Sequence, residues 1–264
     1  LINRLIGAFR GQGKRVGVIA IDPSSALTGG ATLGDRIRML EWQSDGGVFI
    51  RSMASRGRAG GLAPATSGMV HLLDAAGFDV VMVETVGVGQ EAIDVSAIVH
   101  TLVLLQIPAS GDSVQLLKAG LLEYADVFVV NKADLAGAEE LVRGLRSLVG
   151  YAITERHGWL PAIVRCSSET GDGVAKVAEV IKEHWAYLQG EQRLEERRRS
   201  IAQGEIAEHV NEAILSRLQE QGTYGKQIGR LVRDVAERRL APANAAYKLL
   251  EHWDDVEDTD HHGT

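Results

Sequence analysis

Short apolar runs alternate with segments of helical periodicity over the first 189 residues. The apolar runs lie at residues 15–22, 48–53, 79–84, 101–107, 126–130 and 162–166. Runs without a polar face are typical of strands buried on both faces of a parallel sheet. Between them, segments such as 1–10 and 174–188 repeat apolar residues every three or four positions, as amphipathic helices do. The alternation predicts an α/β fold with a doubly wound, mostly parallel sheet over residues 1–189.

After Gly190 the strand pattern ends and charges of both signs alternate along the chain. Two apolar stripes at helical spacing remain, formed by Ile206, Val210, Ile214 and Leu218 and by Ile228, Leu231, Val235 and Leu240. We therefore expect a helical arm over residues 190–250. The stripes can pack on each other, on the main domain or in a second subunit. Residues 251–264 have the acidic composition of a disordered tail.

Composition narrows the class of protein. The chain has 264 residues, 45% of them hydrophobic, which is enough for one large core and for one or two domains. The net charge is −7 with both signs mixed, so no nucleic-acid partner is expected. Cys166 is the only cysteine, which excludes an internal disulfide. No apolar run has the roughly 20 residues of a membrane span and no signal-peptide pattern is present, so we expect a cytoplasmic protein without a membrane partner.

Acidic residues stand where apolar runs end. Asp22 closes the run at 15–22, and Glu84 closes the run at 79–84 before a turn that contains Gly87. Because ligands of parallel α/β sheets bind beyond the carboxyl ends of the strands, these acids are candidates for binding Mg²⁺ and its waters. Asp35 is a third candidate, with a helix N-cap as its alternative role. For Glu84 the alternative is an exposed acid at a strand end.

The tetrapeptide NKAD at residues 131–134 directly follows the buried run at 126–130. An ionised Asp134 at a strand end can accept hydrogen bonds from the N1–H and the 2-amino group of guanine together, whereas adenine has an acceptor at N1 and no 2-amino group. Asn131 and Lys132 would hold this loop, with the methylenes of Lys132 against the base. The end of the next strand supplies backbone donors for the base oxygen at Ser167, Ser168 and Glu169. The sequence therefore predicts guanine recognition.

Several motifs together carry a family resemblance. They are DPSS at 22–25, GG at 29–30, LGD at 33–35, RGxxGGLA at 56–63, ETVGVGQ at 84–90, NKAD at 131–134 and SSxTGxG at 167–173. In this combination the chain resembles the MeaB/ArgK family over nearly its whole length. Members of this family are P-loop GTPases that act as chaperones of adenosylcobalamin-dependent acyl-CoA mutases, chiefly methylmalonyl-CoA mutase.

The resemblance implies binding of GTP and GDP with Mg²⁺, and transfer of the γ-phosphoryl group to water. It assigns Asp22, Asp35 and Glu84 to the metal and its waters, and Glu84, Gly87 and Gln90 to the hydrolytic centre. The backbone N–H of Gly87 would donate to the γ-phosphate. It also implies a mutase partner and a homodimer formed through the arm. Arg56 and Arg58 are either phosphate contacts or solvated loop charges.

One family motif is missing from the sequence. The phosphate-binding loop GxxxxGK[ST] does not occur in the 264 residues, and residues 1–13 resemble the helix that follows that loop. We therefore expect that the first strand and the phosphate loop of a GTPase domain at 1–189 are not included, and that this chain by itself binds GTP weakly or not at all. Two alternatives stay open: a kinase of the ArgK transport-kinase type, and a non-catalytic remnant that acts only as an interaction module.

Overall fold

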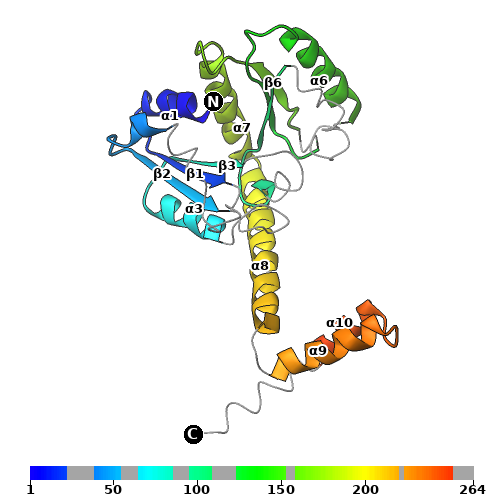
Figure 1. Cartoon of the computed structure of the whole chain (residues 1–264). Coiled ribbons are helices and arrows are strands. Elements are labelled where there is room, and N and C mark those ends of the chain that lie inside the picture. The colour runs from blue at the N-terminus through cyan, green and yellow to red at the C-terminus, as the bar shows by residue number, and fades with distance from the viewer. Residues whose placement is uncertain are drawn as a thin grey trace. The chain divides into compact units, whose positions relative to one another are not determined.

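The computed structural model describes residues 1–22, 39–54, 65–85, 95–108, 123–152, 158–219 and 223–251. The chain forms two compact units, residues 1–205 and 206–264. All predicted strands are present in the first unit, with helices on both sides, so the predicted α/β class is confirmed (Figure 1).

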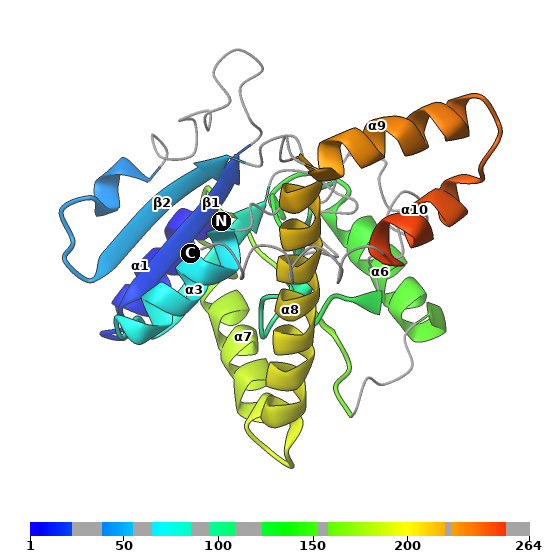
Figure 2. The same ribbon diagram turned by 90° about the horizontal axis from the view of Figure 1, so that it is seen from below.

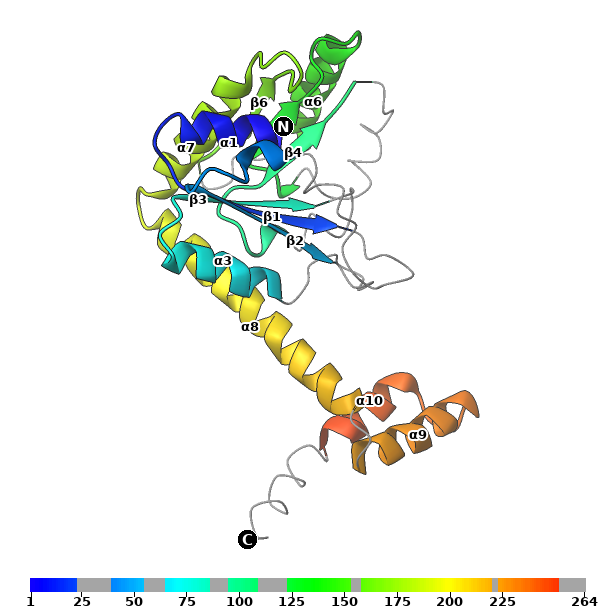
Figure 3. The same ribbon diagram turned by 60° about the vertical axis from the view of Figure 1, so that its left-hand side comes forward.

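The first half of the sheet contains β1 (Val16–Asp22), β2 (Val48–Ala54) and β3 (Val80–Thr85). They are hydrogen-bonded in the order β2-β1-β3, and all are parallel. Val16 is level with Val48 of β2 and with Val80 of β3, so the three strands start together and their carboxyl ends lie at one edge (Figure 3).

The second half of the sheet contains β4 (Val103–Gln106), β5 (Val127–Val130) and β6 (Ala162–Arg165). These strands are also parallel, in the order β4-β5-β6. Within the described residues, no strand joins β3 to β4, so the parallel sheet that the sequence predicts is present as two three-stranded parts.

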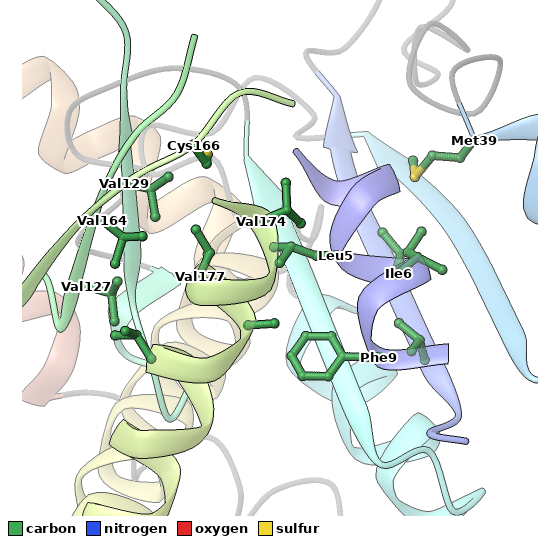
Figure 4. Close-up of a cluster of buried hydrophobic side chains, with 14 of the residues drawn as sticks. Leu5, Ile6, Phe9, Met39, Val127, Val129, Val164, Cys166, Val174 and Val177 are labelled. Atoms are coloured by element: carbon green, nitrogen blue, oxygen red, sulfur yellow. The ribbon is translucent and has the colours of Figure 1, made fainter. Parts of the chain in front are cut away.

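Alternating side chains of the strands pack against helices on opposite faces. Val127 and Val129 of β5 face the cluster formed with α1 (Ile2–Arg10) and α7 (Val174–Leu188), whereas Phe128 and Val130 face α6 (Ala138–Ala152). Figure 4 shows Val174 and Val177 of α7 between β5 and helix α1. This alternation explains why β5, residues 127–130, contains no polar position.

The first half of the sheet is covered in the same way. Val16, Val18 and Ala20 of β1 share the cluster of α1, and Ile19 and Ile21 pack with Leu73 of α3 (Ala65–Ala75) on the other face (Figure 2). Since α1 and α7 contribute to one cluster with strands of both halves, the two halves share a core although no strand connects them. A short 3₁₀ helix, η1 (Leu40–Trp42), precedes β2.

The segment after Gly190 is helical in its described part. It forms α8 (Arg193–Gln219), α9 (Thr223–Ala236) and α10 (Pro242–Glu251), and α9 packs on α10. The first turns of α8 belong to the first unit, where Arg197 donates hydrogen bonds to the carbonyl oxygens of Ser96 and Val99. Most of the predicted acidic tail lies outside the described residues. None of the described helices has the length and apolar character needed to cross a bilayer.

At the amino ends of β4 and β5, a buried histidine connects α7 to the sheet. His184 is 3% exposed; its Nδ1 lies 2.8 Å from the hydroxyl of Thr101 and its Nε2 lies 3.5 Å from Asp126 Oδ1. The ring of Trp159 packs on it at 4.9 Å. Burial lowers the pKa of His184, opposed by the Asp126 carboxylate and reinforced by Arg197. A neutral ring that accepts from Thr101 and donates toward Asp126 fits these contacts.

The free energy of unfolding is expected to fall as the pH is lowered through about 6.5, where an unfolded histidine takes up a proton. The folded His184 has a lower pKa, so the unfolded chain binds more protons in this range and acid favours unfolding. Denaturant unfolding measured at several pH values checks this. His184→Gln should be less stable at neutral pH and should lose part of the pH dependence; an unchanged pH slope in this variant would contradict the assignment.

Candidate functional site

Two loops meet beyond the carboxyl ends of β5 and β6. Backbone hydrogen bonds continue past the strands, from Asn131 N to the Gln106 oxygen at 2.8 Å and from Cys166 N to the Val130 oxygen at 2.9 Å. Ala133 N then donates to the Cys166 oxygen at 2.9 Å. These bonds place the NKAD loop directly beside the loop that begins at Ser167. Both stretches were predicted to contribute to one site, and the structure brings them together.

Asn131 joins the two loops. Its side chain is 8% exposed, and its Oδ1 accepts hydrogen bonds from Ser168 N at 3.0 Å and from the Ser168 hydroxyl at 2.8 Å. The thiol of Cys166 also approaches it, at 3.6 Å. Cys166 is buried, and burial raises the pKa of its thiol, so it acts here as a small apolar residue. The position of the Ser168 backbone thus depends on a side chain of the neighbouring loop.

The NKAD loop at 131–134 and the loop at 167–170 together form a corner beyond β5 and β6. Asp134 is the exposed acid of this corner. The hydroxyl of Ser167 donates a hydrogen bond to its carboxylate and lowers its pKa from the usual 3.8; its own backbone N–H and the charge of Lys132 act in the same direction. The carboxylate is therefore ionised at physiological pH, and it can accept hydrogen bonds from a ligand.

Lys132 holds an unusual backbone conformation between these residues. Its φ angle is 54°, in the left-handed region that costs a non-glycine residue about 1 kcal/mol. The turn is held by the bond from Leu135 N to the Lys132 oxygen at 3.0 Å, and the side chain is exposed. Strained turns of this kind concentrate at binding sites, and this one sets Asn131 and Asp134 on either side of an exposed lysine.

The three backbone N–H groups at 167–169, which were expected to donate to the base, differ in whether they already donate a hydrogen bond within the protein. Ser167 N donates to the Asp172 oxygen at 2.9 Å, and Ser168 N donates to Asn131. The N–H of exposed Glu169 makes no hydrogen bond among the described residues. In this structure the loop therefore presents one open N–H group, beside two that are already hydrogen-bonded within the protein.

The acids expected near a metal lie on the other half of the sheet. Glu84 is level with Ala20, and Asp22 follows two residues farther along β1, so both stand toward the carboxyl ends of adjacent parallel strands. Asp35, Gly87 and Gln90 lie outside the described residues, as do Arg56 and Arg58. Among the described side chains, no group of three or more His, Cys, Asp or Glu residues is arranged to hold a metal ion.

Sequence reasoning missed Arg4 of α1. Its guanidinium donates to the carbonyl oxygens of Ser168 and Glu169, which are 164 and 165 residues away along the chain. No local pattern signals such a contact, because it depends on how α1 packs against α7.

Comparison with known proteins identifies relatives over most of the chain. A protein of Pyrococcus abyssi named as a GTPase is 42% identical over 95% of this chain and 78% of its own length. GTPase ArgK of Escherichia coli is 32% identical over 91% of this chain and 73% of its own length. The solved structure of a LAO/AO transport system kinase superposes with a TM-score of 0.67 at 25% identity, covering 94% of this chain and 74% of that one.

A family model agrees with these similarities. The model described as methylmalonyl Co-A mutase-associated GTPase MeaB matches residues 1–223, which include the whole sheet and both loops of the corner around Asn131 and Asp134. The chain belongs to the MeaB family of GTPases.

Proposed function

We propose that this protein is a GTP-binding and GTP-hydrolysing chaperone that assists cofactor loading and protection of an adenosylcobalamin-dependent acyl-CoA mutase, chiefly methylmalonyl-CoA mutase. The observation that carries the proposal is the corner in which Asn131 fixes Ser168 beside the exposed, ionised Asp134. The mutase partner rests on the family to which the chain belongs.

The corner has the donors and acceptors that guanine requires. The Asp134 carboxylate accepts from N1–H and the 2-amino group, and the loop at 167–169 supplies a donor to the base oxygen, the open N–H of Glu169. The Lys132 methylenes lie against the base. Adenine would leave Asp134 without a donor partner. A site built around such hydrogen bonds discriminates by up to roughly 10⁴-fold against a base that lacks them.

The acids at the carboxyl ends of β1 and β3 fit Mg²⁺ by their chemistry, because hard oxygen ligands suit this ion and parallel strands bring the two chain positions to one edge. Asp22, Asp35 and Glu84 would hold the ion and its waters; when bound, it neutralises charge on the phosphates. Glu84, Gly87 and Gln90 are proposed to orient the attacking water and the γ-phosphate.

The divided sheet supports a proposal for the phosphate site. Every residue of β3 is only half-buried and Leu105 of β4 is 42% exposed, and among the described residues β3 pairs only with β1 and β4 only with β5. We propose that one more parallel strand, from outside residues 1–264, lies between β3 and β4 and leads into a phosphate-binding loop before α1. The relatives that match this chain are longer than it is.

The second unit supports a homodimer. Ile206 and Val210, one turn apart on α8, are 64% and 50% exposed, and Val232 of α9 is 61% exposed. A second copy of this chain would cover such an apolar stripe.

The test is phosphate release by the full-length protein, with and without Mg²⁺ and methylmalonyl-CoA mutase. We expect Mg²⁺-dependent release of free phosphate from GTP, faster with the mutase. Glu84→Ala should weaken the Mg²⁺ dependence, and light scattering of the same samples should give the mass of a dimer. If the γ-phosphoryl group is found on an acceptor molecule and not as free phosphate, the kinase alternative is favoured. If neither free phosphate nor a phosphorylated acceptor is formed, only the role of an interaction module remains.

A further inference from the structure

Arg4 makes a two-pronged contact with the loop that follows β6. Its Nε donates to the carbonyl oxygen of Ser168 at 2.8 Å, and its Nη2 donates to the carbonyl oxygen of Glu169 at 2.7 Å. Both bonds are charge-assisted and short, and the planar guanidinium holds two successive carbonyl groups in one orientation.

The helix that carries Arg4 is firmly anchored. The next residues on its inner face, Leu5, Ile6 and Phe9, are at most 5% exposed and pack in the same cluster as Val174 and Val177 of α7 (Figure 4). An arginine on such a helix can fix a loop, because its own backbone has little freedom to follow the loop's movement.

From the held carbonyls, a chain of contacts leads to Asp134. In a planar trans peptide the N–H points opposite to the carbonyl, so holding the Glu169 oxygen also orients the N–H of Thr170. That N–H donates to the Ser167 hydroxyl at 3.3 Å, and Ser167 is the main cause of the lowered pKa of Asp134. Holding the Ser168 oxygen likewise orients the N–H of Glu169, the open donor of the loop.

We propose that Arg4 is a positioning residue for guanine recognition: it fixes the loop at 167–170 from α1 and thereby sets the open N–H of Glu169 and the Ser167 side chain near Asp134. This inference rests on the proposed function, since it assigns Arg4 a role in binding the base. It also connects α1 directly to the part of the site that would bind the base, although Arg4 and Ser168 are 164 residues apart along the chain.

Arg10 on the same helix provides a matched control. It donates from Nε and Nη2 to the two carboxylate oxygens of Asp45, both at 2.8 Å, and from Nη1 to the Lys14 oxygen at 2.7 Å. Arg10 thus makes three charge-assisted bonds, one more than Arg4, but to Asp45 and Lys14 and not to the loop at 167–170.

The experiment compares Arg4→Ala, Arg4→Lys and Arg10→Ala in the full-length protein. A fluorescent GDP analogue gives the Kd and the dissociation rate, competition with inorganic tripolyphosphate gives the affinity for phosphates alone, and denaturant unfolding gives stability. We expect Arg4→Ala to weaken GDP binding about tenfold, chiefly by faster dissociation, with tripolyphosphate affinity unchanged. Arg4→Lys should restore part of the loss, because an ammonium group can still donate to one of the carbonyls.

Arg10→Ala should lower stability while the Kd for GDP stays at the wild-type value. Equal Kd values for Arg4→Ala and Arg10→Ala would overturn the inference while leaving the proposed function intact. A parallel loss of tripolyphosphate affinity in Arg4→Ala would also overturn it, because the effect would then not be specific to the base. Failure of the wild-type full-length protein to bind GDP would instead overturn the proposed function, and the inference with it.

Discussion

Replacing Asp134 by Asn is expected to transfer the preference of the full-length protein from guanine to xanthine nucleotides. Guanine offers two donors, N1–H and the 2-amino group, to a carboxylate whose pKa Ser167 lowers further below its usual value. An asparagine in the same place offers one acceptor and one donor. Xanthine has N1–H beside a carbonyl oxygen at position 2, so its pattern matches the amide and mismatches the carboxylate.

The expected effect is large because the mismatch leaves a polar group of the site without a partner. GDP affinity should fall by roughly 10³-fold or more in Asp134→Asn, and affinity for xanthosine diphosphate should rise to a comparable extent. Competition of the two unlabelled nucleotides against a fluorescent analogue measures both changes in one assay. The amide geometry of asparagine is close to that of the carboxylate, so the loop should keep its shape.

Two controls separate base recognition from loss of a charge. Asp134→Ala should lose guanine binding without gaining xanthine binding, since alanine offers neither donor nor acceptor. Asp79→Asn removes a charge of the same sign at the amino end of β3, where the Asp79 carboxylate accepts hydrogen bonds from Lys14 Nζ and from the backbone N–H of Arg15. This variant should leave the nucleotide preference unchanged. If Asp134→Asn keeps the wild-type preference, Asp134 does not contact the base.

The parts of this site that the sequence predicts are those set by neighbours along the chain. The run at 127–130 is apolar at every position because β5 is covered on both faces, and the motif directly after it must then lie at the carboxyl end of that strand. Asn131, Asp134 and Ser167 could therefore be assigned to one corner before the fold was known, because parallel neighbouring strands end at the same edge.

The parts that could not be predicted depend on packing between distant segments. The contact of Arg4 with Ser168 requires α1 to lie beside α7, which hydrophobic spacing does not specify. The left-handed backbone conformation of Lys132 could not be predicted from its residue type, because lysine does not favour a positive φ angle. The division between β3 and β4 was also unforeseen, since both segments have the apolar pattern of interior strands.

The loop of the base corner returns sharply onto β6 at Gly173. This residue precedes α7 with a φ angle of 74°. A Cβ atom placed on it would overlap the carbonyl oxygen of Arg165 and lie 3.0 Å from Cα of Cys166. Both contacts are with backbone atoms at the end of β6, so a side chain at this position can be accepted only if the strand end or the loop moves.

Gly173→Ala is therefore expected to lower the free energy of unfolding by roughly 3 kcal/mol or more, which adds the cost of a left-handed alanine to that of the displaced backbone. Since the displaced segment contains Ser167 and Ser168, the full-length variant should also bind GDP more weakly.

Gly171→Ala is the matched control: the φ angle of Gly171 is 91°, but a Cβ there meets no atom within 4 Å. It should cost about 1 kcal/mol and leave GDP affinity nearly unchanged. Urea unfolding and GDP titration of both variants check this, and equal losses of stability would show that backbone conformation alone, without the contact at Arg165, requires glycine at position 173.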